Sequence, residues 1–123
     1  MRNHKSLKAF EMADPIAVEA YCLTATFPKE EMYGLTSQIR RASVSVPSNI
    51  VEGCSRETQE DYKRFLEIVF GSLEELRYQI SLSARLGYIP SSRASESDAK
   101  LDEAEKVLGA PIRSQRPKEV VSR

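Results

Sequence analysis

The sequence predicts an all-α protein folded as an antiparallel, up-down-up-down four-helix bundle. Apolar residues recur at steps of three and four over long stretches, which is the pattern of a helix with one buried face. No stretch alternates apolar and polar residues over the length of a strand. Connections of about four to eight residues separate the periodic stretches, and such short loops place consecutive helices antiparallel.

The first helix is expected over residues 8–26. The pair Asp14-Pro15 interrupts it, so either Asp14 caps a helix that begins at Pro15, or an earlier start continues through a kink. Because Ala9 and Ala13 already fit the apolar stripe, the earlier start is favoured. The stripe consists of Ala9, Ala13, Ile16, Ala20, Leu23 and Phe27.

The second helix is expected over residues 33–52, with a kink at a proline. Pro47 removes a backbone donor and clashes with the preceding turn, which predicts a bend near residues 42–45. Gly53 is expected to close the helix in a left-handed conformation. The predicted seam consists of Leu35, Ile39, Ala42, Val46 and Asn49.

The third helix is the longest, over residues 59–86. Thr58 is the expected cap, with Asp61 three residues later as a variant of the capping box, and Gly87 ends the helix. Its seam consists of Tyr62, Leu66, Val69, Leu73, Leu76 and Ile80.

The fourth helix is expected over residues 95–108 and is the weakest. Gly109 and Pro111 are expected to end it, since both residues disfavour a helix interior. Residues 1–108 are therefore predicted to form a single bundle, followed by an extended or disordered tail over residues 109–123. The thin apolar face of this helix consists of Ala94, Leu101, Ala104 and Leu108.

Composition indicates a globular protein of the cytoplasm. The 123 residues include 18 basic and 18 acidic ones, so the net charge of zero argues against a dominant electrostatic attraction to nucleic acid or membrane. Cys22 and Cys54 have no CxxC spacing and are expected to be reduced thiols. The beginning of the chain has no apolar signal region, and no apolar run approaches the roughly 20 residues that span a bilayer.

No catalytic or metal-binding pattern is visible. His4, the only histidine, stands near the start of the chain, outside the predicted core. The phosphate-binding patterns GxxxxGK(S/T) and GxGxxG are absent from the sequence. Glu67, Glu74 and Glu75 lack the histidine three residues on that di-iron bundles use. The prediction is therefore a non-enzyme without a cofactor, a metal or a small-molecule substrate.

Four polar residues of the second helix are candidates for a site. Arg40 and Arg41 could grip phosphate, or could pair with acids on a neighbouring helix or subunit. Asn49 lies on the predicted seam, where it is expected to bond the carbonyls freed by Pro47 or to fix helix register. A functional role for Asn49 together with Glu52 is the alternative.

Apolar residues outside the seams predict self-association. A monomeric bundle needs one apolar stripe per helix, and the two strongest helices carry more than that. A second buried surface between copies is therefore expected, and its tentative residues are Val44, Val51, Ile68, Phe70 and Leu82.

A family resemblance is carried by two stretches of the chain. They are FPKEEMYGLTSQIRRASVSVPSNIVEG and YKRFLEIVFGSLEELRYQISLSARLGYI. The chain resembles the 23S rRNA intervening-sequence proteins over roughly residues 7–90, and is similar to the accessory variability determinants of diversity-generating retroelements. The resemblance implies a four-helix bundle that assembles as a homopentamer with a central channel. It also implies RNA or a reverse transcriptase as partners.

Two hypotheses for function follow from residues and resemblance together. The first is a non-enzymatic, homo-oligomeric scaffold that binds RNA or an RNA-associated protein. The second is a purely protein-binding or structural oligomer with no role on nucleic acid. Salt dependence separates them, because phosphate contacts release counterions and give a steep decrease of affinity with salt.

Overall fold

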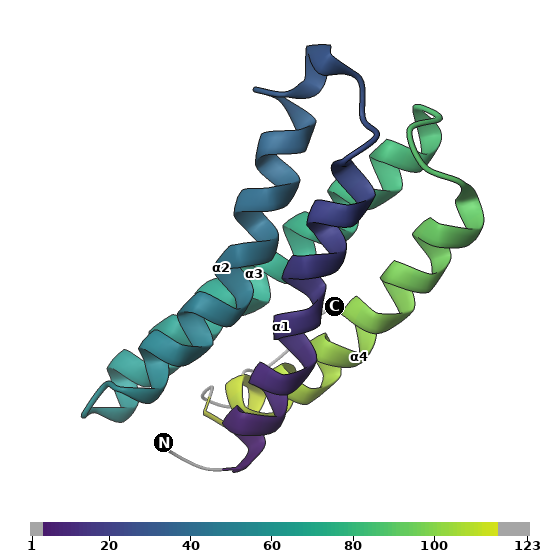
Figure 1. Ribbon diagram of the computed structural model, residues 1–123. Helices are drawn as coiled ribbons and strands as arrows, with labels where there is room; N and C mark the ends of the chain where they lie inside the picture. The colour runs from purple at the N-terminus through teal and green to yellow at the C-terminus, as the bar shows by residue number, and fades with distance from the viewer. Residues whose placement is uncertain (1–3, 116–123) are drawn as a thin grey trace, which may run out of the picture.

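The structure is a computed structural model that describes residues 4–115, with side chains described for residues 7–109. It is a four-helix bundle in which consecutive helices run antiparallel (Figure 1), and residues 4–115 contain no strand. This confirms the predicted fold class. The elements are α1 (His4–Thr24), the short 3-10 helix η1 (Lys29–Glu31), α2 (Leu35–Cys54), α3 (Gln59–Arg85) and α4 (Ser91–Gln115).

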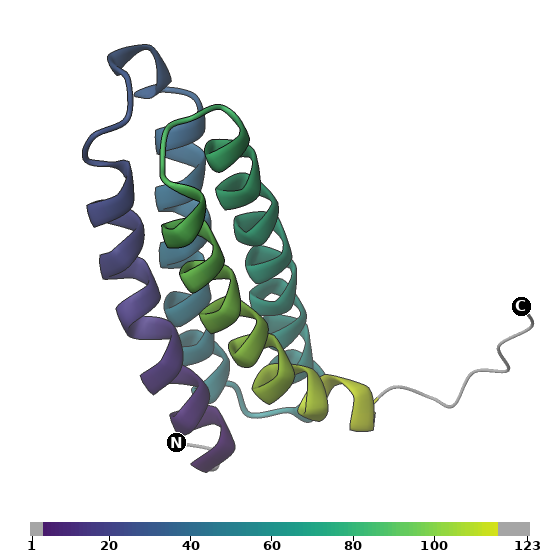
Figure 2. The same ribbon diagram turned by 90° about the vertical axis from the view of Figure 1, so that its right-hand side faces the viewer.

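The helices pack in the order in which the chain visits them. α1 packs on α2, α2 on α3, α3 on α4, and α4 closes the bundle by packing on α1. Figure 2 shows the same arrangement from the side. One apolar core lies between the four helices, and Leu73 and Leu76 at its centre have no exposed surface.

α1 begins well before its proline. Ala9 and Ala13 are buried in the core, so the earlier of the two predicted starts is confirmed. Pro15 lacks the N–H that would bond to the carbonyl of Glu11. Both residues are exposed, so water can satisfy this carbonyl without loss of a buried hydrogen bond.

α2 also continues through its proline, and its buried face differs in one position from the predicted seam. The core-facing residue after Val46 is Ile50, while Asn49 is half-buried at the edge of the helix interface. Leu35 is likewise half-buried. Pro47 is itself buried inside the helix, and the kink at this residue remains a prediction.

Gly53 does not take the left-handed conformation predicted for it. It is buried inside α2, and the glycine with a positive φ among the described residues is Gly87, at 80°. A Cβ atom on Gly53 would lie 2.9 Å from the Cβ of Phe65. Gly53 therefore allows close approach of α2 and α3, whereas Gly87 terminates α3 as predicted.

The predicted cap of α3 is confirmed. The side-chain oxygen of Thr58 accepts a hydrogen bond from the backbone N–H of Asp61, at 3.1 Å. This bond satisfies one of the backbone donors that the first turn leaves unpaired.

α4 is longer than predicted at both ends. It begins at Ser91, directly after Pro90, and Gly109 and Pro111 lie inside it instead of ending it. The prediction of an extended tail from residue 109 is therefore wrong for residues 109–115, and residues 116–123 lie outside the described part of the chain. Because Leu108 and Gly109 are buried, packing on the bundle outweighs the low helix propensity of glycine.

Among the described residues, no helix combines the length and the apolar character that crossing a membrane requires.

Candidate functional site

A shallow groove follows the outer side of α2, next to the end of α1. It has a volume of about 710 Å³ and contains two arginines but no acidic residue. We call it the α2 groove. It is lined by Tyr21, Met32, Tyr33, Thr36, Ser37, Arg40, Arg41, Val44, Ser45 and Asn49.

Arg40 is held in this groove by α1 and not by a carboxylate. Its Nε donates a hydrogen bond to Oγ1 of Thr24 at 2.8 Å, and its guanidinium carbon lies 4.5 Å from the centre of the Tyr21 ring. The buried hydroxyl of Thr24 is oriented in turn, because it donates to the carbonyl of Ala20 at 2.8 Å. Arg40 forms no ion pair with another described residue, so its charge is fixed in place without an internal counter-charge. Such a guanidinium is suited to an external carboxylate or phosphate.

Arg41 differs from Arg40 in this respect. Its Nη2 lies 3.2 Å from Oε2 of Glu75 on α3, and both side chains are well exposed. This is the pairing with a neighbouring helix that the sequence left open as an alternative. The ion pair contributes about 0–1 kcal/mol to stability, as is usual at a surface, and it reduces the charge that Arg41 offers to a ligand.

Asn49 links turns of α2 at the seam with α3. Its Nδ2 donates to the carbonyl and to Oγ of Ser45, at 2.8 and 3.0 Å, and Oγ of Ser45 lies 3.0 Å from Oγ of Ser72 on α3. The carbonyl freed by Pro47 is that of Ser43, four residues before it. The prediction that Asn49 bonds this freed carbonyl is therefore wrong, although its amide is satisfied locally.

Glu52 has a different partner from Asn49. Its carboxylate pairs with the guanidinium of Arg56, four residues on and outside the helix. Since the two predicted polar residues bond to different groups, the structure does not join Asn49 and Glu52 in one site.

Three of the five predicted interface residues are exposed apolar side chains on α2 and α3. Val44 and Val51 on α2 are 40% and 56% exposed, and Ile68 on α3 is 45% exposed. Gly53 approaches Phe65 and Ser45 bonds to Ser72, so Ile68 lies between these two contacts along the α2–α3 seam. We call Val44, Val51 and Ile68 the α2–α3 apolar surface.

The other two predicted interface residues lie elsewhere. Phe70 is half-buried and packs against the core of its own chain. Leu82 is also half-buried, near the end of α3. Neither is as available to a partner as the three residues of the α2–α3 apolar surface.

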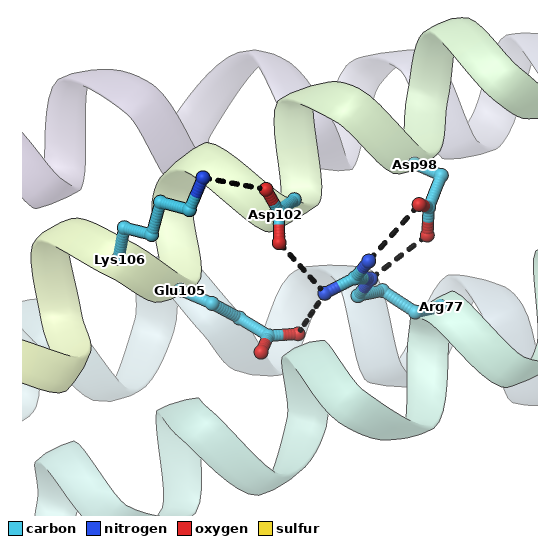
Figure 3. Close-up of polar contacts among 5 residues, drawn as sticks. All are labelled: Arg77, Asp98, Asp102, Glu105 and Lys106. Atoms are coloured by element: carbon cyan, nitrogen blue, oxygen red, sulfur yellow. Dashed lines mark hydrogen bonds and ion pairs between the residues drawn. The ribbon is translucent and has the colours of Figure 1, made fainter.

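An ion cluster that joins α3 to α4 was not predicted. Arg77 donates to both carboxylate oxygens of Asp98, at 2.8 and 3.0 Å, and to Asp102 and Glu105, at 3.3 and 3.2 Å (Figure 3). The three acids are spaced three or four residues apart on one face of α4. That spacing was visible in the sequence, but nothing in it indicated that Arg77 faces this stripe.

The cluster changes the acidity of its members. The hydrogen bond with Asp98 raises the pKa of Arg77, and that with Lys106 lowers the pKa of Asp102. Burial, aided by a hydrogen bond with Glu74, raises the pKa of Glu105, while Arg77 opposes this rise. Because all its charged groups are bonded to one another, we assign the cluster to holding α4 on α3.

The remaining reactive groups are not gathered in one place. Cys22 and Cys54 are free thiols, the first exposed and the second half-buried. Among the side chains of residues 7–109, which the structure describes, no three of histidine, cysteine, aspartate or glutamate are grouped as they would be around a metal ion.

Comparison with known proteins identifies a family and several solved structures of similar fold. Residues 5–110 match the family described as 23S rRNA-intervening sequence protein. A crystal structure at 1.70 Å resolution, of a protein of unknown function from the S23 ribosomal protein family of Bacteroides thetaiotaomicron VPI-5482, is similar with a TM-score of 0.81. It is 21% identical in sequence, and the match covers 89% of this chain and 98% of the other, so the likeness concerns the fold. A comparison with curated proteins gives no match.

Proposed function

Because the chain belongs to the 23S rRNA-intervening sequence protein family, we propose that it is a non-enzymatic, homo-oligomeric scaffold. One observation carries this proposal, namely the α2–α3 apolar surface. Val44 and Val51 lie seven residues apart on one face of α2, Ile68 lies on α3, and each is about half exposed in the single chain. Aligned exposed apolar side chains mark a contact surface more often than scattered ones do. The resemblance described above implies five copies.

Charged substitutions on this surface test the proposal. Val44→Glu combined with Val51→Glu should give the mass of a single chain in light scattering at micromolar concentration, because a contact cannot bury two unpaired carboxylates. Helicity measured by circular dichroism should be unchanged, since both side chains are exposed.

Tyr78→Glu is the matched control. Tyr78 is 61% exposed on α3, outside the α2–α3 apolar surface. This variant should keep the mass of the unmodified protein. An unchanged mass for the double variant would show that the α2–α3 apolar surface is not the contact.

The α2 groove favours RNA as the ligand of this scaffold. Arg40 offers a fixed positive charge there, and no acidic residue lines the groove. Arg40→Ala should weaken RNA binding and make its salt dependence shallower by about one unit of slope, as expected for one lost phosphate contact. Arg41→Ala should have a smaller effect, since Glu75 already pairs with Arg41. If the unmodified protein, Arg40→Ala and Arg41→Ala bind RNA with the same affinity and the same salt dependence, the α2 groove is not the RNA site.

A protein partner is the second candidate. The zero net charge and the Arg41–Glu75 pair both reduce attraction to phosphate, which favours a purely protein-binding oligomer. The resemblance to the retroelement proteins implies a reverse transcriptase as partner. Such an RNA-bound protein would be a protein partner of this kind. If no RNA binding is measured at low salt, the protein-binding oligomer is favoured over the RNA-binding scaffold.

A further inference from the structure

The turn that leads into α2 presents two large apolar side chains to solvent. Tyr33 is 92% exposed, more than any other large apolar side chain that the structure describes, and Met32 is 53% exposed. Both residues line the α2 groove. Packing within the chain does not account for an aromatic ring in this position, so the ring is available to a ligand of the groove.

The same turn is anchored by a carboxylate. Oε1 of Glu31 accepts a hydrogen bond from the backbone N–H of Leu35 at 3.0 Å, and Oε2 accepts one from the hydroxyl of Tyr88 at 2.9 Å. Gly34 leaves room for this carboxylate, because a Cβ atom there would lie 2.8 Å from Oε1 of Glu31. The backbone on both sides of Tyr33 is therefore tied down, and the exposed ring projects from a fixed turn.

Tyr33 shares the groove with a hydroxyl and a fixed positive charge. Ser37 and Arg40 are three residues apart on α2, so they lie on one face of the helix, and both line the groove together with Tyr33. The guanidinium of Arg40 is held in place by α1, as described above. Val44 and Val51, which we assign to the contact between copies, lie beyond Arg40 along α2, on the side away from Tyr33.

This combination fits a single strand of RNA better than a duplex. An unpaired base has a free ring face that can stack on an exposed tyrosine, whereas the bases of a duplex are already stacked on one another. Duplex binding depends instead on neutralising several phosphates. The groove contains only Arg40 and Arg41, and Arg41 is paired with Glu75. Base stacking supplies affinity that the low charge of the groove does not.

We propose that the α2 groove binds single-stranded RNA, with a base stacked on the ring of Tyr33 and a phosphate of the same strand on the guanidinium of Arg40. The hydroxyl of Ser37, between them, can donate or accept a hydrogen bond at the ribose or the base. The inference rests on the proposed RNA binding and adds the form of the RNA and the residue that binds a base.

Fluorescence anisotropy with a labelled mixed-sequence RNA strand, alone and annealed to its complement, tests the proposal. The unmodified protein should bind the single strand more tightly than the duplex. Tyr33→Leu keeps an apolar side chain but removes the ring, so it should weaken single-strand binding about 5- to 150-fold, the loss expected for one base stack. The salt dependence should stay the same for this variant, because no charge is lost, whereas Arg40→Ala makes it shallower.

Two further variants separate the ring from its position. Tyr33→Phe keeps the ring and should lose less affinity than Tyr33→Leu. Tyr78→Leu is the matched control, because Tyr78 is 61% exposed on α3 and does not line the α2 groove. It should bind the single strand as the unmodified protein does. Both tyrosines are exposed, so circular dichroism should show unchanged helicity for all three variants.

The failure of this inference differs from the failure of the proposed RNA binding. Equal affinity for single strand and duplex would overturn the inference, and so would a Tyr33→Leu variant with the affinity of the unmodified protein. Either result would leave RNA binding through Arg40 intact. No binding to either form of RNA at low salt would remove RNA as the ligand together with this inference, and would favour the protein partner.

Discussion

Replacing Arg77 with methionine removes the guanidinium that binds three carboxylates of α4. The aliphatic stem of the side chain is retained, so the change removes charge more than packing. Asp98 and Asp102 are more than 40% exposed, and each such pair contributes about 0–1 kcal/mol. The side chain of Glu105 is only 10% exposed, and its carboxylate would lose this partner.

The loss at Glu105 dominates the expected cost. Breaking a buried ion pair costs about 3–5 kcal/mol when the remaining charge stays ionised. Glu105 reduces that cost by binding a proton, so we expect Arg77→Met to lower the free energy of unfolding by about 3 kcal/mol at pH 7.

The sign of the pH dependence follows from the acidity of Glu105. Burial and the hydrogen bond with Glu74 raise the pKa of Glu105 above its usual 4.5. Arg77 acts in the opposite direction and lowers this pKa, but its effect is the weaker one. A partner that lowers a pKa stabilises the fold at high pH, and this contribution is lost as pH falls through that pKa. The cost of Arg77→Met should therefore be smaller at pH 4.5 than at pH 7.

Urea unfolding followed by circular dichroism at both pH values measures this cost. Arg64→Met is the matched control, because Arg64 pairs with Asp61 on an exposed face of the same helix. Its cost should be about 0.5 kcal/mol or less. A loss for Arg77→Met no larger than that of the control, or one that does not change with pH, would refute this reasoning.

Two further predictions concern packing. Leu73→Ala or Leu76→Ala should each cost about 2–5 kcal/mol by cavity formation, because both side chains are fully buried; a melting temperature unchanged by either would place the core elsewhere. Gly53→Ala should cost about 1–3 kcal/mol, since the new Cβ lies 2.9 Å from that of Phe65 and α2 must move away from α3. Gly71→Ala is its control: a Cβ there meets nothing within 4 Å, so thermal unfolding should show a gain of up to about 1 kcal/mol, and equal effects at the two glycines would contradict the close approach.

The sequence predicted the helices well where burial and helix periodicity agree. The stripe through Leu66, Leu73 and Leu76 identified the core face of α3, and Thr58 identified its start. Propensity rules failed where packing outweighs them. Gly109 and Pro111 were expected to end α4, but the buried face of that helix continues through Leu108 and Gly109.

The candidate site was less predictable than the fold. Arg40 and Arg41 are adjacent and identical in type, yet only Arg40 keeps its charge without an acidic partner. That difference depends on Thr24 and Glu75, which lie 16 and 34 positions away in sequence. Side-chain pairs between helices depend on rotation and register, which helix periodicity alone does not determine.

The position of Asn49 shows the same limit within one helix. A step of three from Val46 leads to Asn49 and a step of four leads to Ile50, and both steps fit a helical stripe. Packing against α3 selects Ile50 for the core and leaves Asn49 to bond with Ser45.

The mass of the unmodified protein tests the proposed self-association most directly. Light scattering at micromolar concentration should give a multiple of the 13.9 kDa chain mass, and the family resemblance makes that multiple five. A dimer or a tetramer would contradict the pentamer but keep a contact between copies. A mass of 13.9 kDa would show that Val44, Val51 and Ile68 stay exposed in solution, and would contradict the account of this chain as a scaffold built from copies of itself.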